Sequence, residues 1–514
     1  MLYLHTLLRQ LDPALLLTGI KNVEVRGVSE DSRLVEPGFL FIARGGTQTD
    51  GKKYIADAHI RGAIAVVTPE ATGGSPLPQV VVKDIASAPS ILANAFFERP
   101  SDKVHVLGVT GTNGKTTTTY LIRHLMASVK RRCGLIGTVD IDDGRTIRPA
   151  TMTTPSAVEI AQLLATMRNK GCWSCAMEVS SHALDQDRVA GVNFAGAAFT
   201  NLTGDHLDYH KSMDKYAAAK ARLFDMLPTT SVAVLNANDP ASERMAKGCK
   251  ARIIRFGIGR KGDYRAKDIH ITDSGSHFIL DTPDGEAEVQ MSLIGRHNIA
   301  NALTAAALVG EVYHLSVHQL VAALRDAPGA PGRLQPVRCG QPFGVFVDYA
   351  HTDDGLENVL QALRPLTRGK LRVLFGCGGD RDRTKRPRMA KVAERLADVI
   401  YLTSDNPRTE EPQSILDEII SGLSADVELS GASRKSAERT TRSRRSLTVR
   451  KPAIVEVDRR RAIERILADS QGGDIVLLAG KGHENYQVVG EEKRHFDDVE
   501  EAQRILENRQ TAAA

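Results

Sequence analysis

The sequence lacks long hydrophobic runs and is poor in cysteine. No stretch of its 514 residues approaches the ~18 apolar residues that a membrane-spanning helix needs. The opening segment, MLYLHTLLRQLDPALLL, is too interrupted by charge to be a secretory signal peptide. The six cysteines are scattered along the chain, which indicates reduced thiols. We therefore expect a cytoplasmic protein without a membrane span.

Two of the cysteines, Cys172 and Cys175, have the spacing of a redox motif. They lead into an apolar strand, and no second pair with this spacing follows. Buried structural thiols are therefore the favoured interpretation.

The basic charge of the chain is concentrated in one segment. The formal net charge is +5, but between Gly431 and Lys451 there are eight Lys or Arg residues against one Glu. The rest of the chain is close to neutral. The Ser/Thr/Arg composition of residues 431–451 predicts a solvated, mobile surface insertion. Docking to an acidic partner or a membrane-associated complex is the alternative, and specific nucleic-acid binding is not expected.

Residues 104–119, VHVLGVTGTNGKTTTT, carry the strongest chemical signal. A short apolar strand leads into a glycine loop and a helix start, whose candidate triphosphate-binding residues are Gly111, Thr112, Asn113, Gly114, Lys115, Thr116 and Thr117. The backbone N–H groups of such a loop and the positive end of the helix dipole attract phosphate. Lys115 would reach the β- and γ-phosphates, and the Thr116 hydroxyl would hold Mg²⁺. Val109 stands where the usual G-x-x-x-x-G-K-[ST] pattern has its first glycine, but Lys-Thr directly after the loop favours ATP binding over an empty glycine turn.

The alternation of short strands and helices predicts an α/β protein of three domains. Residues 1–100 would form a smaller α/β N-terminal domain, and residues 101–331 a central P-loop ATPase domain with a mostly parallel sheet. Residues 332–514 would form a Rossmann-like, doubly wound C-terminal domain after the linker APGAPG at 327–332. Ligands bind at the carboxyl ends of the strands in such sheets, and DYA, GCGGDRD, TSDNPR and AGKGHE all fall there.

Three polar residues of the central segment extend the candidate site. Glu178 ends an apolar strand, His206 follows the next strand, and Lys220 lies in a predicted helix. A carboxylate after the strand beside a phosphate loop commonly completes Mg²⁺ coordination. Taken singly, the three could equally be a surface acid, a loop histidine and a solvated lysine.

Their order along the chain resembles that of the Mur ligase family, ATP-dependent amide ligases of peptidoglycan precursor synthesis. The resemblance covers nearly the whole chain and is closest to members that add the third amino acid. It depends on ten ordered blocks: GTNGKTTT, TTP, EVSSHAL, NLTGDHLDYH, YAAAKARLF, GRHNIANALTA, DYAHT, GGDRDRTKRP, DNPR and GKGHE.

The resemblance implies a reaction and its catalytic groups. ATP would phosphorylate the D-glutamyl carboxylate of UDP-N-acetylmuramoyl-L-alanyl-D-glutamate, and an amine would attack the acyl phosphate without a protein nucleophile. Lys220 would react with CO₂ to give N6-carboxylysine, which requires a neutral amine and hence a cation or metal nearby. Thr116 and Glu178 would hold one Mg²⁺, and His206 with carbamylated Lys220 a second. Lys115 completes the expected catalytic set with Glu178, His206 and Lys220.

The resemblance also places the contacts of the two nucleotides. The expected contacts to the sugar nucleotide, between the first and second domains, are Ser32, Thr47, Gln48, Thr49, Thr153, Thr154, Ser180, Gln186 and Arg188. Those near the ATP base and ribose are Asn301, Arg333, Asp348 and His351. Two positions depart from the family pattern: Met152 stands where relatives often have Asn, and Asp353 replaces a Pro.

The motif DNPR discriminates between possible amino-acid substrates. By resemblance the pocket consists of Arg386, Asp405, Asn406, Pro407, Arg408, Gly480 and Glu484, with Glu484 facing the distal amino group. The planar fork of Arg408 can bind a carboxylate bidentately, and meso-diaminopimelate has one carboxylate more than lysine. An unpaired Arg in a closed pocket would cost a few kcal/mol, a discrimination of ~10². L-Lysine stays the alternative substrate, and a capping turn with an exposed Arg is the interpretation without function.

Two other classes of protein remain possible from the sequence. Folylpolyglutamate synthetases share the phosphate loop and the modified lysine, but DNPR, GKGHE and the segment before residue 100 argue against that class. A non-catalytic nucleotide-binding scaffold would not need Lys115, Glu178, His206 and Lys220 together. We therefore expect an enzyme that acts on small molecules. A monomer is a separate expectation, to which these motifs contribute nothing.

Overall fold

The computed structural model describes residues 1–45, 50–259, 262–431 and 451–513. They form two compact units. The first consists of Met1–Lys267, Leu280–Ala287 and Ala300–Leu324, and the second of Asp268–Ile279, Glu288–Ile299 and Arg325–Ala514. Within the described ranges, no helix combines the length and apolar character that crossing a bilayer requires.

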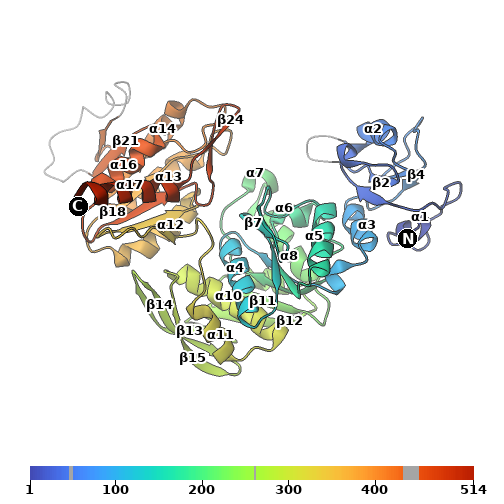
Figure 1. Ribbon diagram of the computed structural model, residues 1–514, viewed down its shortest axis with the longest axis horizontal. Coiled ribbons are helices and arrows are strands. Elements are labelled where there is room, and N and C mark those ends of the chain that lie inside the picture. Colours follow the sequence, from blue (N-terminus) through green and yellow to red (C-terminus); the bar gives the residue numbers. More distant parts are fainter. Residues whose placement is uncertain (46–49, 260–261, 432–450, 514) are drawn as a thin grey trace. The chain divides into compact units, whose positions relative to one another are not determined.

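The first unit begins with a small parallel sheet (blue in Figure 1). Its strands β1 (Gly27–Ser29), β2 (Phe39–Ile42), β3 (Ala65–Thr68) and β4 (Gln79–Val81) lie in sequence order and are all parallel. Its helices are α1 (Leu4–Leu8), α2 (Ile55–Ile60) and α3 (Ala88–Phe96). Short 3₁₀ turns, η1 (Ser32–Leu34), η2 (Gly51–Tyr54) and η3 (Pro100–Asp102), occur between or after them. The central strands β2 and β3 coincide with the apolar runs FLFI and AVV of the sequence.

An eleven-stranded sheet follows, with the order β15-β14-β13-β12-β11-β10-β5-β9-β6-β7-β8. The strands are β5 (His105–Thr110), β6 (Cys133–Ile136), β7 (Asp140–Asp142), β8 (Ile147–Pro149), β9 (Ser174–Glu178), β10 (Phe194–Phe199), β11 (Val232–Asn236), β12 (Arg252–Ile258), β13 (Tyr264–Thr272), β14 (Gly275–Thr282) and β15 (Gly285–Met291). From β12 to β6 neighbouring strands are parallel, and β7 and β8 form an antiparallel edge.

The helices that accompany this sheet are α4 (Lys115–Ser128), α5 (Ala157–Asn169), α6 (Ser181–Asp185), α7 (Leu207–His210), α8 (Met213–Asp225), α9 (Ser242–Ala246), α10 (Arg296–Tyr313) and α11 (Val317–Arg325). Ile160 and Leu164 of α5 share one hydrophobic core with Cys175 and Met177 of β9. All six cysteines are free, and Cys172 and Cys175 are buried, in agreement with structural thiols.

The second unit contains a seven-stranded sheet with the order β16-β17-β22-β18-β19-β21-β20. Its strands are β16 (Gln335–Pro336), β17 (Gly344–Asp348), β18 (Leu371–Phe375), β19 (Val399–Leu402), β20 (Val427–Ser430), β21 (Lys451–Val455) and β22 (Ile475–Ala479), parallel except for β16. A hairpin of β23 (Tyr486–Val489) and β24 (Glu492–His495) follows.

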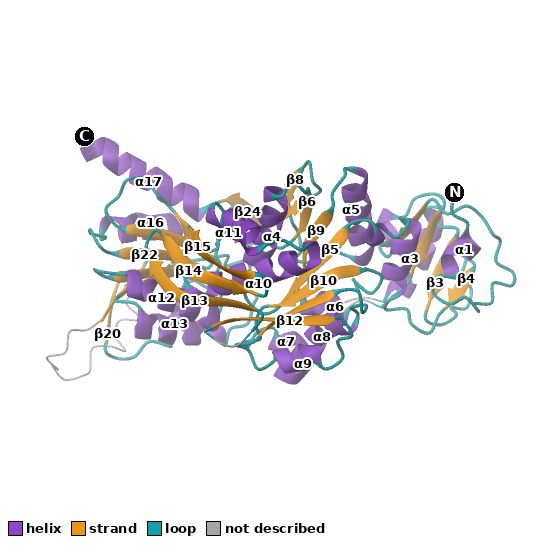
Figure 2. Ribbon diagram, turned by 90° about the horizontal axis from the view of Figure 1, so that it is seen from below, coloured by secondary structure: helices purple, strands orange, loops and turns teal. Residues whose placement is uncertain are grey.

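Helices cover both faces of the seven-stranded sheet, as Figure 2 shows. Leu371, Val373 and Phe375 of β18 pack in one core with α12 (Asp353–Leu363), α13 (Lys385–Leu396) and α14 (Pro412–Ile420). Leu374 packs in another core with α16 (Arg459–Ala468) and α17 (Asp498–Ala513). Because successive side chains of a strand point to opposite faces, β18 is buried on both sides; its one polar residue, Arg372, is paired with Asp474.

The predicted α/β class with mostly parallel sheets is confirmed, and so is the doubly wound character of the last sheet. The three sheets lie within the three predicted segments, but the boundaries at residues 100 and 331 stay predictions. Most of the basic insertion lies outside the described residues.

Substitution of Gly108 in β5 tests the close packing of β5 against β10. A Cβ atom at Gly108 would lie 2.8 Å from Cε1 of Phe194. Gly108→Ala should therefore lower the free energy of unfolding by about 1–3 kcal/mol, because the core is already filled. Gly73→Ala, where nothing lies within 4 Å of the added atom, should have little effect.

Urea unfolding of both variants and of Gly108→Ala/Phe194→Leu provides the measurement. The double variant should be more stable than the sum of the two single losses predicts. Strict additivity would contradict the packing contact.

Candidate functional site

The glycine loop between β5 and α4 is held by its own lysine and by the segment after β10. The Lys115 amine donates to the carbonyl oxygens of Gly111 (2.9 Å) and Thr112 (2.8 Å). The Thr200 hydroxyl donates to the Asn113 carbonyl at 2.6 Å, and the Asn113 N–H donates to the Asn201 side chain at 2.9 Å. The loop is therefore fixed at the carboxyl end of two adjacent strands, where a parallel sheet binds ligands.

Two glycines of this loop have backbone requirements that other residues meet poorly. Gly111 has φ +148° and Gly114 has φ +87°. A Cβ atom at Gly114 would lie 2.3 Å from Oδ1 of Asn301, which places this predicted nucleotide residue directly beside the loop. The close approach explains why glycine stands immediately before the helix.

Glu178, at the end of β9, is fully buried and is held by three hydrogen bonds. The Thr116 hydroxyl donates to Oε2 at 3.1 Å. Thr138 donates its N–H to Oε1 at 2.8 Å and its hydroxyl to Oε2 at 3.1 Å. The predicted pair of Thr116 and Glu178 is thus brought together, and Thr138 is an additional site residue. Its position after the strand adjacent to β9 is the signal that could have identified it.

Lys220 extends from α8 into the same region and is 1% exposed. Its Nζ atom donates to the Gly111 carbonyl oxygen at 2.8 Å and lies 4.3 Å from the ring centroid of Tyr216. Two lysine amines, those of Lys115 and Lys220, therefore share one acceptor. Burial, followed by the charge of Lys115, holds the pKa of Lys220 well below its usual value.

His206 lies before α7 in a cluster of rings. It has φ +53° and is half-exposed, with Nε2 3.4 Å from the Asp205 carboxylate. Its ring centroid is 4.9 Å from that of His182, and the His210 ring lies 5.1 Å from that of Tyr216. Burial, followed by the charges of His206 and His210, lowers the pKa of His182 to about 4. His182 is therefore neutral near pH 7.

The four predicted metal ligands belong to four different chemical types. Across the parts of the chain that the structure describes, no three or more His, Cys, Asp and Glu side chains are grouped so that they could hold a metal ion. The predicted set offers one carboxylate, one imidazole, one hydroxyl and one lysine amine. A further anionic oxygen ligand would have to come from a modified side chain or from a substrate.

Several predicted sugar-nucleotide contacts form one connected network. The Thr154 hydroxyl donates to the Glu178 carbonyl (2.8 Å), and the Ser180 N–H donates to the Thr154 hydroxyl oxygen (3.0 Å). Arg188 donates to the Thr154 carbonyl (2.8 Å) and to the Gln186 side chain (2.7 Å). These hydrogen bonds therefore hold the four predicted contact residues in one group next to the backbone of Glu178.

Other predicted contacts lie around this network. The hydroxyl oxygens of Thr153 and Thr138 lie 3.0 Å apart, and Ser32 is buried in η1. Arg44, which sequence reasoning missed, donates to the Gln186 carbonyl at 3.1 Å and pairs with Glu30 at 2.7 Å. Its position after β2 was the available signal. Thr47, Gln48 and Thr49 lie outside the described residues.

The second unit brings together the loops after β19 and β22. The Asn406 side-chain amide donates to Glu484 at 2.7 Å, and a Cβ atom at Gly480 would lie 2.7 Å from the Asp405 carboxylate. Burial, followed by the charge of Asp405, raises the pKa of Glu484, and Lys481 at 3.7 Å opposes this. Lys481, buried in the same loop, was not predicted.

The backbone of Arg408 is bound to the hairpin of β23 and β24. Its N–H donates to the Val488 carbonyl (3.0 Å) and its own carbonyl accepts from Gly490 (2.7 Å). Nη1 donates to the Gly379 carbonyl at 2.7 Å, and Pro407 is buried. Arg408 as a whole is half-buried.

Arg386, by contrast, is already paired. Its fully buried guanidinium donates to Glu410 (2.8 Å) and Glu418 (2.8 Å) and to the Gly378 carbonyl (3.2 Å). Hydrogen bonding to Arg386 lowers the pKa of Glu410 to about 2. A direct contact of Arg386 with substrate stays a prediction.

The remaining predicted nucleotide residues of the second unit also lie close together. Asp348 accepts hydrogen bonds from the N–H groups of Leu334 (2.6 Å) and Ala350 (2.8 Å), and burial raises its pKa. The Arg333 guanidinium lies 4.6 Å from the ring centroid of Tyr349, which also contacts the ring of His351 at 4.6 Å. Tyr349 was not predicted.

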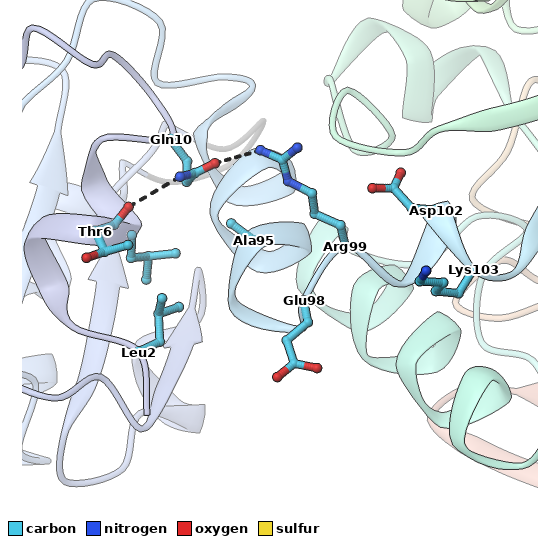
Figure 3. A pocket seen from close by; sticks show the side chains of 9 residues that line it. Leu2, Thr6, Gln10, Ala95, Glu98, Arg99, Asp102 and Lys103 are labelled. Atoms are coloured by element: carbon cyan, nitrogen blue, oxygen red, sulfur yellow. Dashed lines mark hydrogen bonds between the residues drawn. The ribbon is translucent and has the colours of Figure 1, made fainter.

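A cavity of about 430 Å³ lies elsewhere in the first unit. Figure 3 shows Gln10 between Thr6 and Arg99, with hydrogen bonds of 3.4 and 2.7 Å to them. The lining residues are Leu2, Thr6, Leu7, Gln10, Ala95, Glu98, Arg99, Asp102 and Lys103. None of them is a predicted site residue, so this cavity is not the candidate site.

The lowered pKa of Lys220 predicts a pH-dependent stability. Between the folded-state pKa and the unfolded value near 10.4, the unfolded chain binds a proton that the folded chain does not, so wild-type stability rises with pH. Lys220→Met removes this dependence. In CO₂-free buffer it should raise the free energy of unfolding by about 1 kcal/mol or more near pH 7, with a smaller gain near pH 10.

Urea unfolding at the two pH values measures this, with Lys215→Met on the same helix as the matched control. Lys215 is exposed, and its loss should change stability by less than about 0.5 kcal/mol at either pH. A loss of stability in Lys220→Met at both pH values would contradict the account.

Comparison with known proteins identifies the family of the chain. Three family models match the chain: "Mur ligase family, catalytic domain" over residues 24–98, "Mur ligase middle domain" over 109–309 and "Mur ligase, glutamate ligase domain" over 332–482. A Thermosynechococcus vestitus protein named UDP-N-acetylmuramoyl-L-alanyl-D-glutamate–2,6-diaminopimelate ligase is 44% identical over 493 residues, which are 95% of this chain and 94% of that protein.

Solved structures of Mur ligases are similar in fold to this chain. One of a ligase with that same name has a TM-score of 0.66 at 33% identity and covers 95% of both chains. The MurF ligase of Thermotoga maritima in complex with ADP is similar in fold, with a TM-score of 0.60 at 17% identity over 95% of this chain and 99% of its own. On this full-length similarity, the chain belongs to the Mur ligase family of ATP-dependent ligases.

Proposed function

We propose that the chain is an ATP-dependent amide ligase that joins meso-2,6-diaminopimelate to the D-glutamyl carboxylate of UDP-N-acetylmuramoyl-L-alanyl-D-glutamate. The observation that carries the proposal is the 44% identity, over 95% of the chain, to a relative named for this reaction. The buried, oppositely charged groups after β19 and β22 support a substrate that has both amino and carboxylate ends.

The first half of the reaction concerns the glycine loop. A D-glutamyl carboxylate oxygen attacks the γ-phosphorus of ATP, ADP leaves, and an acyl phosphate forms. The Lys115 amine, which donates to the loop carbonyls of Gly111 and Thr112, would turn to a phosphate oxygen of bound ATP. The loop N–H groups and the start of α4 supply further positive potential at the same place.

In the second half, the free amine of the incoming amino acid attacks the acyl carbon. The tetrahedral intermediate loses the amine proton and expels inorganic phosphate, which leaves the amide. No protein side chain forms a covalent bond to substrate. The protein binds and orients two anionic substrates and a zwitterionic amino acid, and offsets the repulsion between the anions.

The first unit also suits the metal and the modified lysine that the resemblance implies. The Thr116 hydroxyl contacts the Glu178 carboxylate, so two groups whose oxygen atoms can coordinate a metal ion lie together beside the glycine loop. Lys220 has the lowered pKa that reaction with CO₂ requires. Thr116 and Glu178 would hold one Mg²⁺, and His206 with carbamylated Lys220 a second. Bound Mg²⁺ would neutralise charge on the transferred phosphoryl group.

The networks already described support the proposed nucleotide contacts. Thr153, Thr154, Ser180, Gln186 and Arg188 would bind the sugar nucleotide, and Arg44 would position Gln186. Asn301, beside the glycine loop, would contact ATP. Roles for Ser32, Arg333, Asp348 and His351 at the nucleotides are part of the same proposal. We propose a monomer that acts in the cytoplasm.

The proposed roles in the amino-acid site pair each charged group of the substrate with a side chain of opposite charge. Arg408 would bind the distal carboxylate of meso-diaminopimelate, and Glu484 with Asp405 the distal ammonium group. Asn406 orients Glu484, and Gly480 leaves room for the Asp405 carboxylate. L-Lysine, which lacks the extra carboxylate, would leave Arg408 without a partner.

Substrate choice tests the function and the role of Arg408 together. ADP release with UDP-N-acetylmuramoyl-L-alanyl-D-glutamate, ATP and Mg²⁺ should depend on meso-diaminopimelate. Arg408→Met should lower kcat/KM for meso-diaminopimelate by about 10²-fold, because a buried carboxylate loses its partner. Arg395→Met, an exposed arginine of α13, should change it by less than about twofold.

Turnover with L-lysine equal to that with meso-diaminopimelate would keep the ligase and contradict the role of Arg408. No turnover with either amino acid would contradict the proposed function.

Carbamylation of Lys220 predicts that activity depends on CO₂. After exhaustive removal of CO₂ the rate should fall by about tenfold or more, and bicarbonate should restore it, because the free amine cannot act as an anionic ligand. Lys220→Met should be inactive under both conditions. With ¹³C-bicarbonate, the wild type should show a carbamate carbon signal by NMR that Lys220→Met lacks; its absence from active wild type would contradict the modification.

A further inference from the structure

An ion pair that the proposed reaction does not use is buried in the second unit. Arg459 begins α16 and Asp498 begins α17, and both side chains are 0% exposed. Nε of Arg459 donates to Oδ1 of Asp498 at 2.8 Å, and Nη2 donates to Oδ2 at 2.6 Å. The pair therefore has the two parallel hydrogen bonds of a bidentate contact.

The same guanidinium also reaches the backbone before each amino-acid-binding loop. Nη2 donates to the carbonyl of Ala479 at 3.0 Å, and Nη1 approaches the carbonyl of Ser404 at 3.4 Å. Ala479 immediately precedes Gly480, and Ser404 immediately precedes Asp405. One side chain thus connects the starts of the two loops that carry Asp405, Arg408 and Glu484.

Stability alone does not explain such a pair. Replacing a buried ion pair by well-packed apolar residues is often neutral or stabilising, because removing two charges from water is costly. Burial opposes the charge of Arg459, but Asp498, Asp405 and Glu484 outweigh it and raise its pKa. The cation is therefore retained next to two carboxylates that are proposed to bind substrate.

We infer that Arg459, oriented by Asp498, is a positioning residue for the second substrate: it fixes the relative placement of the loops 405–408 and 480–484 and supplies positive charge beneath Asp405 and Glu484. This inference depends on the proposed amino-acid site. The inference predicts that weakening the bidentate contact between Arg459 and Asp498 lowers the affinity for the amino acid much more than the affinity for ATP or the sugar nucleotide.

The chain offers a matched control in the same sheet. Arg372 and Asp474 form a second buried pair, with 8% and 6% of their side chains exposed and Nε 2.9 Å from Oδ2. Arg372 is near the start of β18, and Asp474 directly precedes β22. This pair is therefore at the opposite ends of the parallel strands from the amino-acid loops.

The experiment compares Arg459→Lys with Arg372→Lys in the full-length enzyme. Lysine keeps the charge but cannot form the bidentate fork. Steady-state kinetics gives KM for meso-diaminopimelate, ATP and UDP-N-acetylmuramoyl-L-alanyl-D-glutamate, and urea unfolding gives the stability of each variant. Asp498→Asn, which keeps the shape of its side chain, is measured in the same way and decides the question if Arg459→Lys does not fold.

We expect Arg459→Lys or Asp498→Asn to raise KM for meso-diaminopimelate by about tenfold or more, with the other two KM values within about twofold of wild type. Arg372→Lys should lower stability without changing KM for meso-diaminopimelate. Equal KM effects in the Arg459 and Arg372 variants, equal effects on all three substrates, or a loss of stability alone would overturn the inference. Failure of the wild type to use meso-diaminopimelate would instead refute the proposed function, and the amino acid that it does accept would then serve for the same comparison.

Discussion

The meeting of two lysine amines at one carbonyl oxygen is the constraint on which the catalytic part of the structure depends. Lys115 and Lys220 both donate to Gly111, and Lys220 is fully buried there. Two cationic groups cannot be brought together in a low-dielectric interior without raising the free energy of the charged forms. The region therefore favours the binding of anions, and at least one of the two lysine amines favours its neutral form.

The surrounding elements maintain this arrangement. The strands β5, β9 and β10 are neighbours, and each contributes at its carboxyl end: the glycine loop, Glu178, and the segment with Thr200 and Asn201. Helix α8 supplies Lys220 and, four residues earlier, Tyr216 under its amine. In the second unit the same rule of parallel sheets places Asp405 and Glu484 together, and backbone hydrogen bonds join Arg408 to the hairpin of β23 and β24. Chemistry in both units thus follows from strand order.

Local patterns allowed much of this to be predicted from the sequence. The glycine loop, the apolar strands and the polar residues at their ends have short-range signals, so Lys115, Glu178 and DNPR could be identified directly. Thr138 and Arg44 had only the weak signal of a position after a strand, and Arg459 had none, because their roles depend on partners 40, 142 and 39 residues away. The pairing of Arg386 with Glu410 and Glu418 likewise depends on how α13 and α14 pack, and sequence reasoning assigned this arginine only to substrate.

The central claim is that the D-glutamyl carboxylate is activated as an acyl phosphate, and the most direct test follows an oxygen atom. The substrate carboxylate is labelled with ¹⁸O, the ligation is run to completion, and the inorganic phosphate is analysed by mass spectrometry. The account predicts one ¹⁸O atom in the phosphate for each amide formed, because the carboxylate oxygen that attacks ATP leaves with the phosphoryl group. Unlabelled phosphate, or label in AMP, would contradict it.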